Sequence, residues 1–328
     1  MNNPKSSTRR KFLYKGGILS TAILYSNSLI SKTIELLKNN VFNSKFFGVQ
    51  IGVITYSFRS MPQDVNSLIQ YCKDCNINAI ELMGESIEQH LGKPKRDKSI
   101  PYNSNSKEMK DYRKNVIAWR TNISMKKFKE IKKLFNNNGI KIYAFKPNAM
   151  RKDNTDAEIE YALKAGKSLG ASHVTVEIPK DNAHSLRLGK LAEKNKMYIA
   201  YHAHKQASDH TWDIAMSQSP YNAINLDCGH YIAAGGKNTQ QSLLNFIIKN
   251  NKKIMSMHIK DRSSNKKGKT DHPWGEGETP ISEILKLLKE KQYKIPASIE
   301  LEYTIPKNSN AVEEVKKCLN YAKNALST

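Results

Sequence analysis

The strict alternation of strand-like and helix-like segments is the feature of this sequence that most limits its fold. Short, mostly apolar segments with strand character are each followed by a segment with helical periodicity. The eight strand candidates are residues 47–54, 78–83, 140–145, 172–177, 197–204, 223–227, 254–258 and 297–302. Such alternation is typical of a parallel sheet, and eight units favour a closed barrel over an open sheet. The sequence therefore predicts a single-domain α/β fold, a (β/α)8 TIM barrel, over residues 46–328.

One polar segment interrupts this regular pattern. Residues 84–120 are rich in Lys, Ser, Asn and Pro and are too long for a plain connection between a strand and a helix. We expect an inserted loop there, over the mouth of the barrel or at its side. The next helix is predicted to begin after Ser124 and to end at Asn138-Gly139.

Polar and charged side chains gather at the C-terminal ends of the strand candidates. Asp227 ends one strand, and His230 is expected in the loop that follows it. TIM barrels carry their sites at this end of the strands, and His with carboxylates is a ligand set for Zn, Mn, Fe or Co. The residues at these ends are Glu81, Lys146, Glu177, His202, His204, Asp227, His230, His258, Lys260, Asp261, Glu300 and Glu302. The sequence thus predicts a metal-binding site at the mouth of the barrel.

Several of these segments resemble a known family. They are Asn225–His230, His258–Asp261, Trp274–Gly277, Ser298–Glu300 and the triplet His202-Ala203-His204. They are similar to segments of the sugar phosphate isomerase/epimerase superfamily, which has a xylose isomerase-like barrel, and the resemblance covers about residues 46–326. Gly275 and Gly277 are expected to shape a turn with positive φ.

The resemblance implies a divalent metal ion (Mn, Zn, Mg, Co or Fe) bound by Asp227, His258 and Glu300. Glu302 is the alternative to Glu300, because residues two apart face the same side of a strand. The family usually takes a fourth ligand, a Glu, from the fifth strand, where this sequence has His202. The fourth ligand is therefore either His202 or Glu177.

The resemblance also implies a substrate and a reaction. Side chains expected to contact the substrate are Lys146, His204, His230 and Lys260. Those expected to act in catalysis are Glu177, Glu300 and His202. The expected activity is a sugar or keto-sugar isomerase or epimerase, acting through proton abstraction and a metal-stabilised enediolate.

Three alternatives remain open at this point. A lyase or dehydratase acting on an oxidised (3-keto) glycoside would use the same first half-reaction. A nuclease similar to apurinic endonuclease would explain the net charge of +23. A non-catalytic barrel would bind a sugar only.

The expected partner is a small carbohydrate and not nucleic acid, because the basic residues are scattered and not clustered with aromatic residues. The oligomeric state is left open, a dimer included.

Residues 1–45 are predicted to be an export signal and a linker. Arg9 and Arg10, followed by Phe12-Leu13 and an apolar run at 16–30, resemble a twin-arginine signal. The run is short and carries Ser, Thr, Tyr and Asn, so no stable membrane span is expected. Export to the periplasm is the corresponding expectation, and a basic disordered tail is the alternative.

Cys72 and Cys75 fall within a helical pattern that includes Leu68 and Ile69. This spacing indicates a buried stripe of a helix, and neither a redox pair nor a metal site.

Overall fold

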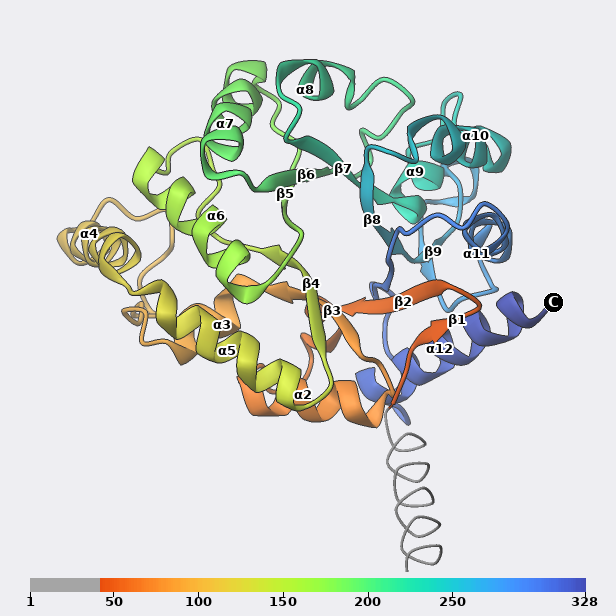
Figure 1. Ribbon diagram of the computed structural model, residues 1–328, viewed down its shortest axis with the longest axis horizontal. Coiled ribbons are helices and arrows are strands. Elements are labelled where there is room, and N and C mark those ends of the chain that lie inside the picture. The colour runs from red at the N-terminus through yellow and green to blue at the C-terminus, as the bar shows by residue number, and fades with distance from the viewer. Residues whose placement is uncertain (1–41) are drawn as a thin grey trace, which may run out of the picture. The chain divides into compact units, whose positions relative to one another are not determined.

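The structure is a computed structural model that describes residues 42–328, and Asn43–Thr328 form one compact unit. Each barrel strand pairs in parallel with the next one along the chain, and the last pairs with the first, which closes the sheet (Figure 1). The strands are β2 (Val49–Ile54), β3 (Ala79–Met83), β4 (Lys141–Lys146), β5 (His173–Glu177), β6 (Tyr198–His202), β7 (Asn222–Asp227), β8 (Ile254–Ile259) and β11 (Ala297–Ile299). The predicted TIM barrel is confirmed. The expected export signal falls in residues 1–41, outside the described part of the chain.

Helices surround the barrel because each turns its apolar stripe toward the strands. In α5, for example, Phe128, Ile131 and Phe135 are buried. The helices that follow the strands are α2 (Val65–Asp74), α5 (Met125–Asn137), α6 (Asp156–Leu169), α7 (Asn182–Asn195), α8 (Asp213–Gln218), α9 (Cys228–Ala234), α10 (Gln240–Asn250), α11 (Ile281–Glu290) and α12 (Ala311–Ser327). The predicted cap of α5 is confirmed, since the Ser124 side chain accepts the Lys126 N–H.

The expectation of a loop over residues 84–120 is wrong. This segment contains two helices, α3 (Gly84–His90) and α4 (Lys107–Asn122). The α4 helix is capped by Ser106, the residue before it, whose hydroxyl accepts the Met109 N–H. Its buried side chains are Met109, Val116 and Arg120. Only two of the three are apolar, so the hydrophobic periodicity that reveals a helix in a sequence is weak here.

Two smaller differences concern the ends of strands. His230 does not lie in a loop but in the first turn of α9, because Asp227 caps that helix and accepts the His230 N–H at 2.7 Å. The last barrel strand ends at Ile299, so Glu300 and Glu302 follow it. A short hairpin, β9 (Asp261–Arg262) with β10 (Asp271–His272), flanks the basic loop after β8.

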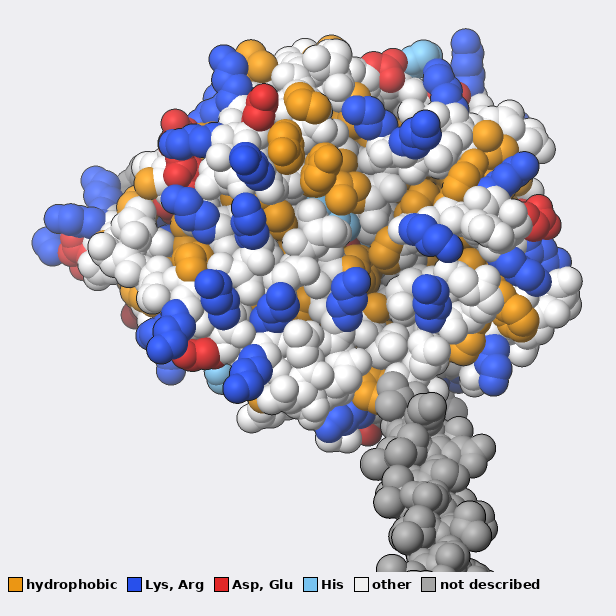
Figure 2. All heavy atoms as spheres, viewed as in Figure 1, with side chains coloured by type: hydrophobic (Ala, Val, Ile, Leu, Met, Phe, Trp, Pro, Cys, Tyr) orange, Lys and Arg blue, Asp and Glu red, His pale blue; other side chains and the backbone are white. Residues whose placement is uncertain are grey.

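The cysteines agree with the sequence, and the distribution of charge does so on one face of the molecule. On the face shown in Figure 2, Lys and Arg side chains are spread over many elements and not gathered into one patch. Cys72 lies buried in α2, with Cys75 directly after it, and both are free thiols, as the predicted helix stripe requires. Among residues 42–328, no helix is both long and apolar enough to cross a membrane.

Candidate active site

Neighbouring strands bring the predicted ligands together at the C-terminal end of the barrel. His202 is the last residue of β6, and Asp227 is the last of β7. Parallel pairing sets Asp227 beside His258 of β8, and the Glu300 N–H donates to the Ile259 carbonyl. Four adjacent positions around the barrel thus supply His202, Asp227, His258 and Glu300. All four side chains are buried.

His258 lies between two carboxylates. Its Nε2 is 2.8 Å from Glu81 Oε2, and its Nδ1 is 3.1 Å from Glu300 Oε2. Burial alone would lower the pKa of His258, but Glu300 and Glu81 outweigh it and raise that pKa to about 10. The bond to Glu81 fixes the ring and leaves Nδ1 facing Glu300 and Asp227, whose Oδ2 is 3.9 Å away.

A second hydrogen bond orients His202. Its Nδ1 lies 3.0 Å from Asn225 Oδ1, while the Asn225 amide donates to Ser256 Oγ at 2.7 Å. His202 Nδ1 is therefore the donor, and Nε2 carries the free lone pair. This Nε2 lies 3.7 Å from Asp227 Oδ2. Burial, with the nearby charges of Lys146 and His258, holds the pKa of His202 well below its usual value, so the ring is neutral.

Lys260 lies in the middle of the acidic side chains. Its ammonium is 2.9 Å from Asp227 Oδ2, 2.6 Å from Glu300 Oε2 and 2.9 Å from Glu302 Oε2. Burial works to raise the pKa of Glu300, but His258 and Lys260 hold it well below its usual value. The pKa of Asp227 is raised, chiefly because the carboxylate is fully buried. A single lysine thus neutralises part of a buried acidic cluster.

The donor atoms of this cluster fit a divalent metal ion. Ligand atoms of His202, Asp227 and His258 all lie within 4.8 Å of one another. Asp227 Oδ2, His258 Nδ1 and Glu300 Oε2 are buried and lie within ion-pair distance of Lys260 or of one another, but none of these contacts has the geometry of a good hydrogen bond. Nitrogen and carboxylate donors at this spacing suit a metal such as zinc. An ion at this position would require the Lys260 ammonium to move away from Asp227 and Glu300.

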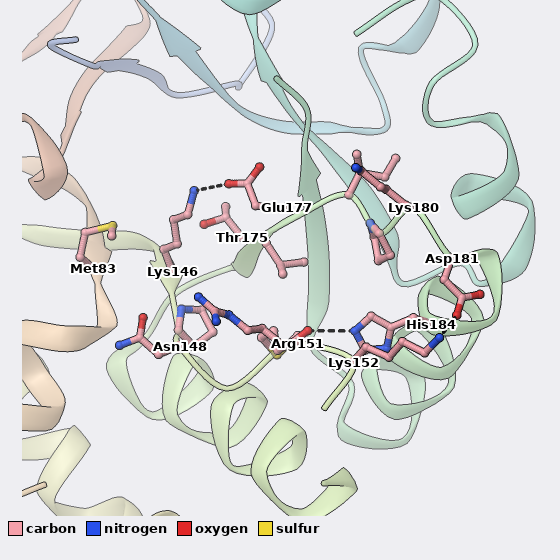
Figure 3. Close-up of a pocket in the computed structure, with 15 residues that line it drawn as sticks. Met83, Lys146, Asn148, Arg151, Lys152, Thr175, Glu177, Lys180, Asp181 and His184 are labelled. Atoms are coloured by element: carbon pink, nitrogen blue, oxygen red, sulfur yellow. Dashed lines mark hydrogen bonds and ion pairs between the residues drawn. The ribbon is translucent and has the colours of Figure 1, made fainter. Parts of the chain in front are cut away.

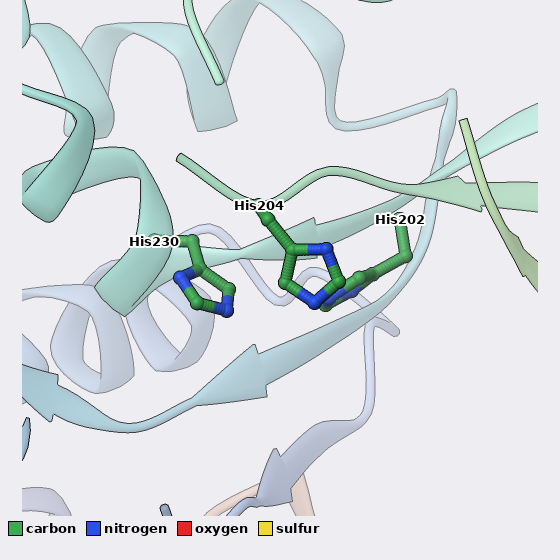
Figure 4. A group of neighbouring side chains, drawn as sticks. All are labelled: His202, His204 and His230. Carbon is green, nitrogen blue, oxygen red and sulfur yellow. The ribbon is translucent and has the colours of Figure 1, made fainter. Parts of the chain in front are cut away.

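Three histidines form a second group beside the first. His202, His204 and His230 also hold ligand atoms within 4.8 Å of one another (Figure 4). The His204 and His230 rings are 4.6 Å apart. His230 is buried, and burial together with Lys260 lowers its pKa to about 2. His204 is half-exposed, and its contact with Glu177 raises its pKa.

Glu177 lies at the edge of this histidine group and is 45% exposed. One carboxylate oxygen contacts Lys146 Nζ at 2.9 Å, and the other contacts His204 Nδ1 at 2.9 Å. Although partial burial opposes it, these contacts lower the pKa of Glu177 below its usual value. Lys146, Thr175 and Glu177 line a cavity of about 470 Å³ (Figure 3). The histidine group and this cavity therefore adjoin at Glu177.

Sequence reasoning missed the roles of Asn225 and Arg262. Asn225 precedes Asp227 by two residues and so shares its face of β7, which is a usable signal. The Arg262 guanidinium lies 3.2 Å from Glu302 and 2.9 Å from Asp271. His258, Lys260 and Arg262 are each two residues apart in the sequence. The contact of Arg262 with Glu302 fixes that carboxylate at the rim of the cluster.

Asp261 holds the turn at residues 275–279 in place, and this turn is a structural part of the site. The Asp261 carboxylate accepts the backbone N–H groups of Gly275, Gly277 and Thr279 at 2.8–3.0 Å. Gly275 has the expected positive φ, of 95°. Gly277 does not, and it is required for another reason: a Cβ there would lie 2.2 Å from Asp261 Oδ1. Asp261 therefore faces the turn and not the cavity.

Solved structures with the same barrel include enzymes and a zinc-containing protein. A sugar phosphate isomerase/epimerase from Parabacteroides distasonis is 16% identical, with a TM-score of 0.56 over 86% of this chain and 96% of that one. The IolI protein, with a bound zinc atom, is 16% identical, with a TM-score of 0.58 over 85% and 98%. The 3-keto-D-glucoside 4-epimerase from E. coli is 12% identical, with a TM-score of 0.56 over 84% and 99%. Identities this low establish a shared fold.

Comparison at the level of sequence gives two results. A search of curated proteins found no match. Residues 69–321 match the family described as xylose isomerase-like TIM barrel, which is most of the barrel unit. The chain therefore belongs to the xylose isomerase-like TIM barrel family.

Proposed function

We propose that this protein is a divalent-metal-dependent isomerase or epimerase acting on a sugar or keto-sugar. The observation that carries the proposal is the convergence of His202, Asp227, His258 and Glu300 donor atoms beside a cavity bordered by Glu177. The sugar phosphate isomerase/epimerase and the 3-keto-D-glucoside 4-epimerase with the same fold support this class of reaction. The zinc atom in the IolI protein supports the metal.

His202 is the proposed fourth ligand in preference to Glu177. Its Nε2 lone pair is turned toward Asp227 by the hydrogen bond to Asn225, whereas both Glu177 oxygens are engaged by Lys146 and His204. A divalent ion held by His202, Asp227, His258 and Glu300 would supply a Lewis acid that polarises a substrate carbonyl and stabilises negative charge on its oxygen. This assignment leaves Glu177 outside the proposed ligand set.

Glu177 is the proposed base. Its carboxylate lines the cavity and is ionised, so it is placed to accept a proton from a carbon next to the substrate carbonyl, although the contacts that lower its pKa also weaken it as a base until the substrate displaces them. Lys146 and His204 hold its two oxygens in place and supply positive charge nearby. Return of the proton to the neighbouring carbon isomerises the sugar, and return to the opposite face epimerises it. Loss of a β-substituent instead gives a lyase, and all three outcomes begin with the same transfer to Glu177.

Deuterium exchange tests that shared first step. The metal-loaded protein is incubated in D2O with free sugars and 3-keto-glycosides, and loss of the C–H signal is followed by NMR. We expect exchange that stops with chelator and falls at least a hundredfold in Glu177→Gln, in line with general base catalysis. Glu290→Gln, at the exposed end of α11, is the matched control. Protein that binds no divalent ion and exchanges no proton in any of these sugars would refute the proposal.

The predicted export signal would narrow the choice of substrates. Arg9 and Arg10 resemble a twin-arginine signal, which carries folded proteins across a membrane. We propose that the barrel is exported and acts on free or oxidised saccharides and not on phosphorylated ones. A fusion of residues 1–45 to a reporter enzyme, with Arg9→Lys and Arg10→Lys as the comparison, tests whether this segment directs export.

A non-catalytic sugar-binding barrel is the second candidate, and the position of Lys260 favours it. The ammonium already lies within 2.9 Å of three carboxylates and neutralises part of their charge without a metal. Such a protein would bind a saccharide equally well with and without divalent ions. Calorimetry of sugar binding in chelator and in zinc separates this candidate from the enzyme.

A further inference from the structure

A second, larger cavity lies beside the one that Glu177 borders. Its volume is about 820 Å³, within the roughly 300–1,000 Å³ typical of small-molecule sites. Its walls come from α3, the segment after it, α4 and the residues that follow β4. The α3 and α4 helices belong to the polar segment 84–120, which the eightfold strand–helix repeat does not require. The proposed function gives no role to this cavity.

The floor of this cavity is a network of ion pairs with little free charge. Arg120 of α4 donates to both oxygens of Glu88 at 3.0 and 3.1 Å and to Glu158 of α6 at 3.0 Å. Lys93 pairs with Glu85 and with Glu88. Glu88, Glu158, Lys93 and Arg120 are all buried. The acidic side chains near the cavity are therefore mostly occupied by these two cations.

The walls above this floor carry an excess of positive charge. Seven basic and three acidic side chains line the cavity. No carboxylate among residues 42–328 lies within ion-pair distance of five of the basic side chains. They are Lys95, Arg96, Lys98, Arg113 and Arg151. In the described part of the chain, Asp153 is the one further carboxylate on these walls, so a net positive charge remains, and it favours an anionic ligand.

Two of these guanidinium groups flank an aromatic ring. Arg113 and Arg151 lie 6.0 and 5.9 Å from the centre of the Tyr102 ring, and Arg113 also donates to the Tyr102 carbonyl at 2.7 Å. A pair of guanidinium groups can bind a carboxylate, sulfate or phosphate with two parallel hydrogen bonds each. Tyr102 and Tyr112 add aromatic surface to the same wall. Such a wall suits a sugar that carries an anionic group.

The cavity adjoins the proposed reaction site. Asn148 and Arg151 line both cavities, and Figure 3 shows them next to Lys146. Asn148 donates to Glu85 at 2.7 Å, which fixes the boundary between the two cavities. A saccharide whose reacting unit lies at Glu177 can therefore extend toward Arg151 and Arg113.

We propose that the 820 Å³ cavity binds an anionic group of the saccharide substrate, so that the substrate class is acidic sugars. This inference rests on the proposed function for the placement of the reacting unit. The shared chemistry is a carboxylate or sulfate on a sugar, and a preference for phosphate would contradict the proposed export.

Calorimetry on the full chain tests the inference with four probes. They are glucose, glucuronic acid, glucose 6-sulfate and glucose 6-phosphate, each titrated at low and at high salt. We expect at least one anionic sugar to bind roughly tenfold more tightly than glucose and to lose this advantage at high salt, as a charge-assisted contact should. The three anionic probes identify which acidic group is preferred.

Variants show whether the preference belongs to this cavity. Arg113→Gln and Lys98→Gln line only the larger cavity, and each should weaken the anionic sugar about tenfold while leaving glucose unchanged. Lys110→Gln, on the exposed side of α4, is the matched control. Because Arg113 also contacts Tyr102, thermal unfolding of each variant confirms that it is folded.

Three outcomes would overturn the inference. They are equal affinity for glucose and all three acidic sugars, an equal loss in Lys110→Gln, and tighter binding of a single-stranded oligonucleotide to the same residues. Binding of an acidic sugar by a protein that binds no divalent ion and exchanges no proton in any sugar tested would instead refute the proposed enzyme and leave this cavity assigned. Deuterium exchange with neutral sugars alone would support the proposed enzyme and refute the assignment of this cavity.

Discussion

Lys260 is the residue that most affects how the cluster can bind a metal. Its ammonium lies within 2.9 Å of Asp227 and Glu300, two of the proposed ligands. Two like unit charges 4 Å apart repel each other by about 4 kcal/mol at an effective dielectric constant of 20. The repulsion between the Lys260 ammonium and a divalent cation at that distance would be twice as large. The lysine and the ion therefore compete for the same carboxylates.

Replacing this lysine should strengthen metal binding. In Lys260→Met, a chain of similar length without charge removes the ammonium from Asp227 and Glu300 and leaves His258 as their remaining cationic neighbour, and we expect the dissociation constant for zinc to fall at least tenfold. Calorimetry with zinc alone measures this without any substrate. Lys146→Met is the comparison, because Lys146 pairs with Glu177 outside the proposed ligand set. Equal or weaker zinc binding in Lys260→Met would show that Lys260 and the ion do not share the site.

The sequence predicts which residues form the site better than it predicts which side chains those residues contact. Asp227 and His258 stand at strand ends in recognisable motifs, and the structure brings them together. The carboxylate that orients His258 is Glu81, which is 177 residues away in the sequence. No local pattern indicates this pairing, because the barrel closes only through contacts between distant strands.

At the scale of elements, the strand and helix ranges were largely predictable, and α4 was not. Strand-like alternation and capping signals such as Ser124 depend on a few neighbouring residues, so they can be read locally. The α4 helix is attached instead by Arg120, which pairs with Glu88 of α3 and Glu158 of α6. A helix anchored by a buried charge has only a weak apolar stripe for periodicity to detect.

The attachment of α4 makes a prediction about stability. Arg120→Met leaves Glu88 and Glu158 buried without their main partner, and breaking a buried pair in this way costs about 3–5 kcal/mol. The free energy of unfolding, measured by denaturant titration, should fall by about that amount. Lys107→Met, which breaks the exposed pair with Asp111 on the same helix, should change it little. A loss of the same small size in both variants would mean that Arg120 does not anchor α4.

At the scale of the whole molecule, the interior of the barrel is a connected polar network. His173 of β5 bonds to Ser256 of β8, which accepts a hydrogen bond from Asn225 of β7. Asn225 in turn holds His202 of β6. The sequence predicts strands that are mostly apolar. The polar residues on their inner faces come into contact with one another only when the barrel closes. The site at the mouth therefore rests on hydrogen bonds that cross the barrel.

This interior makes the stability of the barrel sensitive to acid through His173. The ring is fully buried between Ser172 and Ser256, and burial lowers its pKa from 6.5 to about 4, although Glu81 opposes this shift and His258 adds to it. Between pH 6.5 and 4 the unfolded chain binds a proton there that the folded chain does not, so stability falls as the pH falls. At 1.36 kcal/mol per pKa unit, the loss from pH 7 to pH 4.5 is about 2–3 kcal/mol.

His173→Gln cannot titrate and should lose that much less free energy of unfolding between these two pH values, each protein being compared with itself by denaturant titration. His210→Gln, on the exposed turn before α8, serves as the matched control and should behave as the unmodified protein does. An equal loss in His173→Gln would place the acid sensitivity of the barrel in other groups.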